Sequence, residues 1–141
     1  MTYHAHHVTG LRLYRSLFYE NGYDSVQINN ARDVEFCYNT LDGCGYRREP
    51  NQGSAFSCTM DGRIYNCVVK NNYNGIGVFG PYLKGLEVFN SVLTAAKLTA
   101  GWYLIRWSND QNPQTVISNM FYNIHNNVVK ANKIGILTGN V

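Results

Sequence analysis

Alternating apolar and polar residues recur in five short segments of the chain, which begin near Leu11, Val34, Gly62, Leu86 and Tyr122. Each segment is followed by a small polar residue or a cysteine, and then by a second apolar run. These intervening positions are Ser16, Asn39, Cys67, Ser91 and Asn127, and subtraction gives steps of 23, 28, 24 and 36 residues between them. A period in the twenties with occasional longer repeats predicts a solenoid of stacked coils.

The second half of each repeat decides between two kinds of solenoid. Residues 34–41 and 86–93 fit the leucine-rich pattern LxxLxLxxN, which should continue into a helix. Instead, residues 21–28, 71–78 and 131–136 read as an Asn/Gly turn followed by another alternating strand, because Asn and Gly tolerate positive φ and β-branched residues suit a pleat. Two or three strands in each coil, with no helix, predict a parallel β-helix.

Residues 66–78 (NCVVKNNYNGIGV) and 126–136 (NNVVKANKIGI) carry a likeness to a known group. With these segments the chain resembles the right-handed parallel β-helix superfamily of pectate-lyase-like proteins. The resemblance implies an all-β fold, namely a right-handed solenoid of about five coils. This solenoid should form a single domain over residues 1–141. Neither terminus offers an end cap, so we expect a part of a longer solenoid or a protomer whose ends other chains cover.

The resemblance also bears on function and location. Members of the superfamily include polysaccharide lyases, glycoside hydrolases, uronate epimerases, phage tailspikes and adhesins, so it implies a polysaccharide partner and an extracellular, cell-surface or virion-associated place. Residues 1–10 nevertheless lack the apolar core of a signal peptide. Such a fold supports many activities, and the function must be argued from particular residues.

Stacking the coils turns the repeats into rows of residues that point inward. The expected core positions of the first strand are Leu11, Leu13, Val34, Phe36, Gly62, Ile64, Leu86, Val88, Tyr122 and Ile124. The small polar residues that end these strands should point inward at a bend, where side chains of one kind can form a hydrogen-bonded ladder.

Three rows should point outward, spaced by about 4.8 Å from coil to coil. A charged row reads Arg12, Glu35, Arg63, Glu87, Asn123; an aromatic row reads Tyr14, Cys37, Tyr65, Phe89, His125; and an apolar row reads Leu17, Thr40, Val68, Val92, Val128. We interpret the charged row as an exposed ladder that fixes register, with a charged binding surface as the alternative. The aromatic row offers rings for the apolar faces of sugars, or else a surface that another chain covers. The apolar row favours contacts with a second copy or with the remainder of a longer chain.

The last strand of each coil forms the face where many enzymes of the superfamily keep their active site. Its outward positions should be Ser25, Gln27, Ala55, Ser57, Gly75, Gly77, Leu104, Arg106, Gly135 and Leu137, which predicts a shallow trough with Gln27 and Arg106 on its floor. Two loops, residues 42–51 and 108–113, could form its walls. We expect Arg106, Arg47 and Arg48 to contact an acidic sugar.

Catalytic residues cannot be assigned from the sequence. No two carboxylates fall on adjacent coils of the trough, and Asp24, Asp42, Asp61 and Asp110 each sit in a turn, where Asp is common. No cofactor is required, and calcium held by carboxylates is implied only by the resemblance. Two hypotheses follow. The first is a module that binds a polysaccharide, either with or without cleaving it by lyase or hydrolase chemistry, and the second is a non-catalytic tailspike shaft or adhesin stalk.

Composition narrows the choice of partners. The net charge is +3 and charged residues make up 15% of the 141 residues, a balance that does not favour nucleic acid or a membrane surface as a partner. The apolar runs are too short to span a bilayer.

The four cysteines lack the spacing of a zinc site: Cys37, Cys44, Cys58 and Cys67. We expect buried thiols, with a disulfide from Cys44 as the alternative. The cluster of His4, His6 and His7 is expected to be a frayed terminus rather than a metal site.

Overall fold

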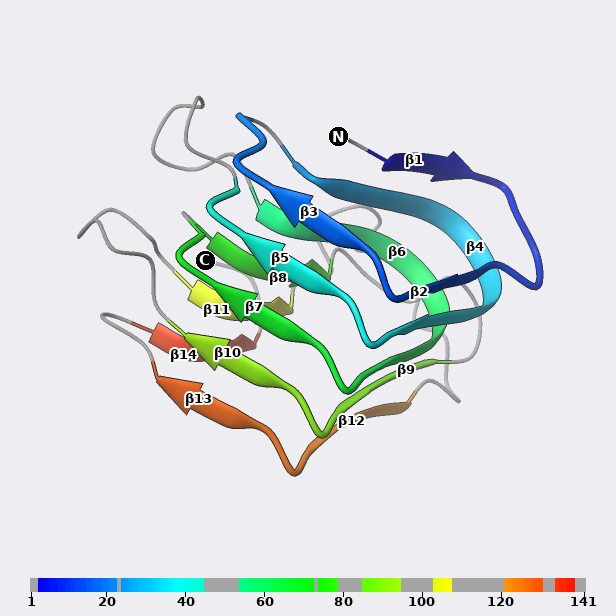
Figure 1. Cartoon of the computed structure of the whole chain (residues 1–141). Helices are drawn as coiled ribbons and strands as arrows, with labels where there is room; N and C mark the ends of the chain where they lie inside the picture. Colours follow the sequence, from blue (N-terminus) through cyan, green and yellow to red (C-terminus); the bar gives the residue numbers. More distant parts are fainter. Residues whose placement is uncertain are drawn as a thin grey trace.

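The computed structural model describes residues 3–22, 24–44, 54–72, 74–78, 85–94, 103–107, 121–130 and 134–138. Within these ranges the chain is all-β, without a helix, and every strand pair is parallel. The strands of successive repeats lie side by side, so that sequence order runs down the molecule from blue to red in Figure 1. The fold class of the described residues, all-β with parallel sheets, is therefore as the sequence predicts.

The strands form three faces. Face I contains β1 (Tyr3–His6), the first part of β4 (Val26–Cys37), the first part of β6 (Ser54–Tyr65), β8 (Asn74–Val78), β11 (Tyr103–Trp107) and β14 (Ile134–Thr138). Face II contains β2 (Arg12–Tyr14), the last parts of β4 and β6, β9 (Gly85–Phe89) and β12 (Phe121–His125). Face III contains β3 (Leu17–Tyr19), β5 (Thr40–Asp42), β7 (Val68–Lys70), β10 (Val92–Thr94) and β13 (Val128–Lys130). Faces I and II belong to one nine-stranded sheet, and face III is a separate five-stranded sheet.

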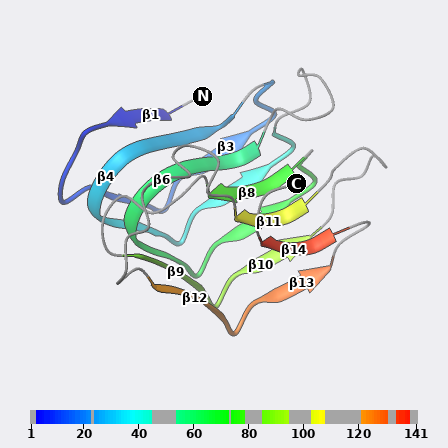
Figure 2. The ribbon, with the colours of Figure 1, turned by 180° about the vertical axis from the view of Figure 1, so that it is seen from behind.

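Strands β4 and β6 each run for 12 residues and continue from face I into face II. Both curve around one side of the molecule, as Figure 2 shows from behind. The turn within β4 is made by register shifts between Asn29 and Ala31 and between Ala31 and Val34, and Asn30 and Asp33 have positive φ. The sequence predicts separate strands here, because irregular positions of this kind interrupt the alternation without ending the strand.

The predicted rows are confirmed by the strand register. Phe36 pairs with Leu13 and Ile64, and Val88 pairs with Ile64 and Ile124. The row of Val34 continues through Gly62 and Leu86 to Tyr122. Gly62 is needed in that row because a Cβ atom there would lie 2.1 Å from the carbonyl oxygen of Val34.

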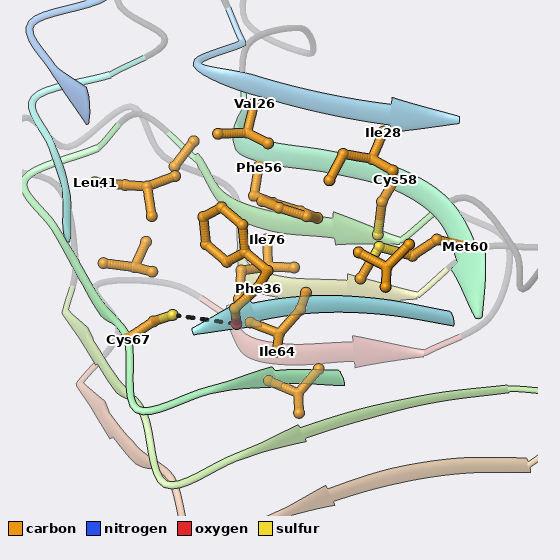
Figure 3. Packing of buried hydrophobic residues seen from close by; sticks show 14 of the residues in the cluster. Val26, Ile28, Phe36, Leu41, Phe56, Cys58, Met60, Ile64, Cys67 and Ile76 are labelled. Carbon is orange, nitrogen blue, oxygen red and sulfur yellow. Dashed lines mark hydrogen bonds between the residues drawn. The ribbon is translucent and has the colours of Figure 1, made fainter. Parts of the chain in front are cut away.

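Side chains from all three faces meet in one core (Figure 3). Phe36 of face II and Phe56 of face I pack edge to face, with ring centroids 4.6 Å apart. Leu41, Val69 and Leu93 close the core from face III and have no exposed surface. Because each repeat buries its side chains against those of the next, the repeats stabilise one another.

The bend between faces II and III has the same backbone conformation in every repeat. Its first residue is Arg15, Tyr38, Asn66, Asn90 or Asn126, and all five have φ between 50° and 57°. This left-handed conformation costs about 1–2 kcal/mol for an ordinary L-residue, and Asn adopts it more readily than most residues do. The backbone of this bend therefore favours Asn, which three of the five repeats have at this position.

The next residue of each bend forms the predicted ladder, which we call the first ladder. The backbone N–H of Ser16 donates to Asn39 Oδ1 at 2.9 Å, and Asn39 Nδ2 donates to the carbonyl oxygen of Leu13 at 2.9 Å. Ser91 and Asn127 repeat the first contact at 2.9 Å, and Ser91 Oγ accepts from the backbone N–H of Cys67 at 3.1 Å. The side chain of one repeat thus satisfies backbone groups that the bend of the preceding repeat removes from the strand ladder.

A second ladder, which we did not predict from the sequence, lies at the end of face III. Asn21, Cys44 and Asn72 are buried there, each directly after a residue with positive φ. The backbone N–H of Cys44 donates to Asn72 Oδ1 at 2.7 Å, and Asn72 Nδ2 donates to the carbonyl oxygen of Leu41 at 3.0 Å. The same arrangement therefore holds both ends of face III.

The four cysteines are free and buried, which confirms the predicted thiols and excludes the alternative of a disulfide from Cys44 within this structure. Burial raises the pKa of Cys67 from 9.0 to about 12, and it raises the pKa of Cys58 and Cys44 as well. The Cys67 thiol lies 3.6 Å from the carbonyl oxygen of Phe36, as the dashed line in Figure 3 marks. Cys67 takes the same ladder position as Ser91 and Ser16.

Cys67→Ser should keep the fold, because serine fills this position in two other repeats, and it should make stability less sensitive to alkali. In the unfolded chain the Cys67 thiol loses its proton near pH 9, whereas the folded protein retains it up to about pH 12. Burial of the neutral thiol therefore stabilises the folded protein fully below pH 9. Between pH 9 and pH 12 this contribution to the free energy of unfolding falls by at most about 1.4 kcal/mol per pH unit. Urea unfolding between pH 7 and pH 10.5 should show a shallower decline for the variant than for the wild type. Identical declines would show that the Cys67 thiol is not buried in this way.

Candidate functional site

Face I carries a row that begins with the polar residues His4, Gln27 and Ser57, and we call it the polar row. Strand register places His4, Gln27, Ser57, Gly77, Arg106 and Leu137 in this row. His4 is exposed, and its Nδ1 atom lies 2.8 Å from Oε1 of Gln27, which is half-buried. Register therefore brings Gln27 and Arg106 into one row, as predicted; the Arg106 side chain lies outside the described residues.

The predicted trough is wrong in one respect, because several of its floor positions are not open. Ser25 and Ala55 have no exposed surface, and Ser57 is 5% exposed. Ser25 precedes the first residue of β4 and contacts Asn21, whose Nδ2 atom donates to its hydroxyl oxygen at 3.1 Å. Strict alternation fails at this strand start because the chain is still completing the bend.

A shorter row of polar side chains runs beside the polar row on face I. Register places His6, Asn29 and Thr59 together in it. His6 is exposed, while Asn29 and Thr59 are half-buried. The Thr59 hydroxyl also accepts a hydrogen bond from the backbone N–H of Asn30 at 2.9 Å. Neither row contains a carboxylate, so the described part of face I presents imidazole, amide and hydroxyl groups.

Face II carries the charged row in the predicted register. Arg12 pairs with Glu35 at 3.3 Å and with Asp33 at 3.0 Å, and Arg63 pairs with Glu87 at 3.5 Å. These side chains are partly exposed to solvent, where an ion pair is worth about 0–1 kcal/mol. The contacts support the interpretation of this row as a ladder that fixes register.

The aromatic row also lies on face II in the predicted register, but its rings face one another. Tyr65 and Phe89 stack with centroids 5.0 Å apart, and Phe89 and His125 stack at 5.1 Å. Phe89 therefore has a ring on each side, and its faces are not free for a sugar. His125 Nε2 also lies 3.0 Å from Glu87 Oε1, which ties the end of the stack to the charged row.

Tyr65 occupies the centre of this arrangement. A hydrogen bond with the Cys37 side chain, followed by smaller effects of desolvation and of nearby negative charge, raises the pKa of Tyr65 to about 12. The Tyr38 ring meets the Tyr65 ring edge to face at 6.1 Å. Within the aromatic row, the ring that remains widely exposed is that of Tyr14, at 59%. The Tyr14 ring is thus open to a ligand, whereas both faces of the Phe89 ring are covered.

Face III exposes the apolar row. Leu17, Val92 and Val128 are 64%, 39% and 62% exposed, while Thr40 and Val68 between them are half-buried. Strand register joins all five residues in one row. Beside it, Lys70 pairs with Asp42 at 3.4 Å. The expected exposed apolar row is therefore present.

Other predicted features lie outside the described residues, namely Arg47, Arg48, most of the loop at 42–51 and the whole loop at 108–113. Among the residues that are described, no three His, Cys, Asp or Glu side chains lie where they could share a metal ion. The described ranges also contain no helix that is long and apolar enough to cross a membrane.

Comparisons with known protein families, with curated proteins and with solved structures found no match.

Proposed function

We propose that the chain is a right-handed parallel β-helix that binds a polysaccharide. The parallel pairing of every repeat, the recurrence of one bend conformation and the ladders at both ends of face III support this architecture. Such a protein would meet its ligand outside the cell, at a cell surface or on a virion.

The polar row of face I is the observation that carries the binding proposal. Two of its hydrogen-bonding side chains, His4 and Gln27, lie on adjacent strands, about 4.8 Å apart along the direction in which the repeats stack. Amide and imidazole groups can donate to and accept from sugar hydroxyls. A polymer that lies along this direction would present similar groups to successive strands, with Gln27 near one end of the row and Arg106 further along it.

Cleavage is not part of the proposal, because the carboxylates of face II already have other contacts. Glu35 and Glu87 belong to one row, but Arg63 lies between them and each carboxylate pairs with an arginine. A glycoside hydrolase needs two carboxyl groups that face each other across the bond. Arg12 and Arg63 hold Glu35 and Glu87 instead.

Replacing Gln27 by Ala should weaken polysaccharide binding about tenfold, because it removes one side chain with two hydrogen bonds to offer. His4→Ala should act in the same direction, since His4 contacts Gln27. Affinity electrophoresis against a panel of neutral and acidic polysaccharides would measure this effect. Thr94→Ala, a change on face III, is the matched control and should bind like the wild type. Unchanged binding by both face I variants would contradict a site on the polar row.

A second candidate function is a structural shaft that self-associates through the apolar row. The exposure of Leu17, Val92 and Val128 favours it, since contiguous exposed apolar surface commonly marks an interface. Sedimentation velocity should then show an oligomer for the wild type and a monomer for Val92→Asp. A wild type that remains monomeric at high micromolar concentration would exclude this candidate.

A further inference from the structure

The bend between faces II and III holds two residues that its backbone does not favour. Three repeats place Asn66, Asn90 or Asn126 at the left-handed position, but the first two repeats place Arg15 (φ 54°) and Tyr38 (φ 57°) there. Tyr and Arg lack the short polar side chain that eases this conformation for Asn. Residues held in such conformations often cluster at functional sites.

These two residues are neighbours across the first two repeats. The backbone N–H of Arg15 donates to the carbonyl oxygen of Cys37, the residue that directly precedes Tyr38. Tyr14, which directly precedes Arg15, pairs with the same Cys37. Tyr14, Arg15 and Tyr38 therefore lie together at the edge between faces II and III.

The two tyrosine rings at this edge are open to solvent. Tyr14 is 59% exposed and Tyr38 is 57% exposed. Tyr38 meets the Tyr65 ring edge to face, at an interplanar angle of 72°, so that Tyr65 steadies it without stacking on it. This differs from Phe89, which has a parallel ring on either side. Exposed rings of this kind can pack against the C–H face of a sugar.

Arg15 adds a positive charge to the two rings. Arg12 and Arg63 on the same face are engaged by carboxylates, whereas Arg15 is exposed and has no carboxylate within 4.0 Å among the described residues. A guanidinium group matches the geometry of a carboxylate and can pair with it through two hydrogen bonds. An anionic partner would therefore complete this edge.

We propose that Tyr14, Arg15 and Tyr38 form a binding site for an acidic sugar residue of a polysaccharide. The tyrosine rings pack against the sugar, and the Arg15 guanidinium pairs with its carboxylate. The site deepens the proposed function and rests on it, but it lies at a different edge of the molecule from the polar row. It also explains why the first two repeats depart from Asn at the bend.

Tyr38→Asn tests this site without the risk of unfolding the protein, because it introduces the residue that three other repeats use. The melting temperature should rise by about 4 °C, since the strained backbone is relieved. The affinity for alginate oligosaccharides, measured by isothermal titration calorimetry, should fall at least tenfold. Arg15→Asn should also raise the melting temperature. It should weaken the binding of alginate, whose sugars carry carboxylates, and leave the binding of its methyl ester unchanged.

Tyr19→Ala is the matched control, because Tyr19 is 54% exposed but lies on face III, and it should bind like the wild type. If the Tyr38→Asn variant is more stable but binds alginate with unchanged affinity, the proposed site is wrong. A lower melting temperature for this variant would overturn it too, because Tyr38 would then serve packing. Loss of binding in Gln27→Ala alone would refute this site while the proposed function stands. A wild type that binds no polysaccharide would refute both.

Discussion

Side-chain hydrogen bonds at the bends are the interaction on which the rest of this structure depends. A parallel strand pairs its backbone groups with its neighbours only while it remains extended, and each bend interrupts that pairing. Asn39 supplies the missing acceptor to Ser16 and the missing donor to Leu13, and Asn72 does the same for Cys44 and Leu41. A bend that leaves no buried polar group unpaired can lie against the core, and the repeats can then stack in fixed register.

Fixed register turns a repeated sequence into surfaces of distinct chemistry. Residues at equivalent positions of successive repeats lie side by side on adjacent strands, however many residues separate them in the chain. Ser91 and Asn127 meet in this way although 36 residues separate them. Face I thereby gathers hydrogen-bonding groups, face II charges and rings, and face III an exposed apolar row. The proposed site of Tyr14, Arg15 and Tyr38 arises where two of these faces join.

Much of this arrangement could be predicted from the sequence, because register follows from the period. The charged, aromatic and apolar rows and the first ladder are in the structure as the alternation indicates. The second ladder also had a signal, since Asn21, Cys44 and Asn72 repeat the steps of 23 and 28 residues found from Ser16 to Asn39 and from Asn39 to Cys67. The backbone conformation of Tyr38 could be anticipated from the Asn residues at the same position.

Other features depend on side-chain directions that alternation does not specify. The stacking of Phe89 between two rings and the inward turn of Ser25 are of this kind.

Amide hydrogen exchange at the first ladder would test the central claim most directly. Nuclear magnetic resonance would follow individual backbone amides in the wild type and in Asn39→Ala. If the Asn39 side chain is the acceptor, the Ser16 amide should lose most of its protection in the variant, while the amide of Thr40, which donates to a backbone carbonyl of Ser16, should remain protected. Equal protection of Ser16 in both proteins would contradict the account, because the bend would then be held by something other than the ladder.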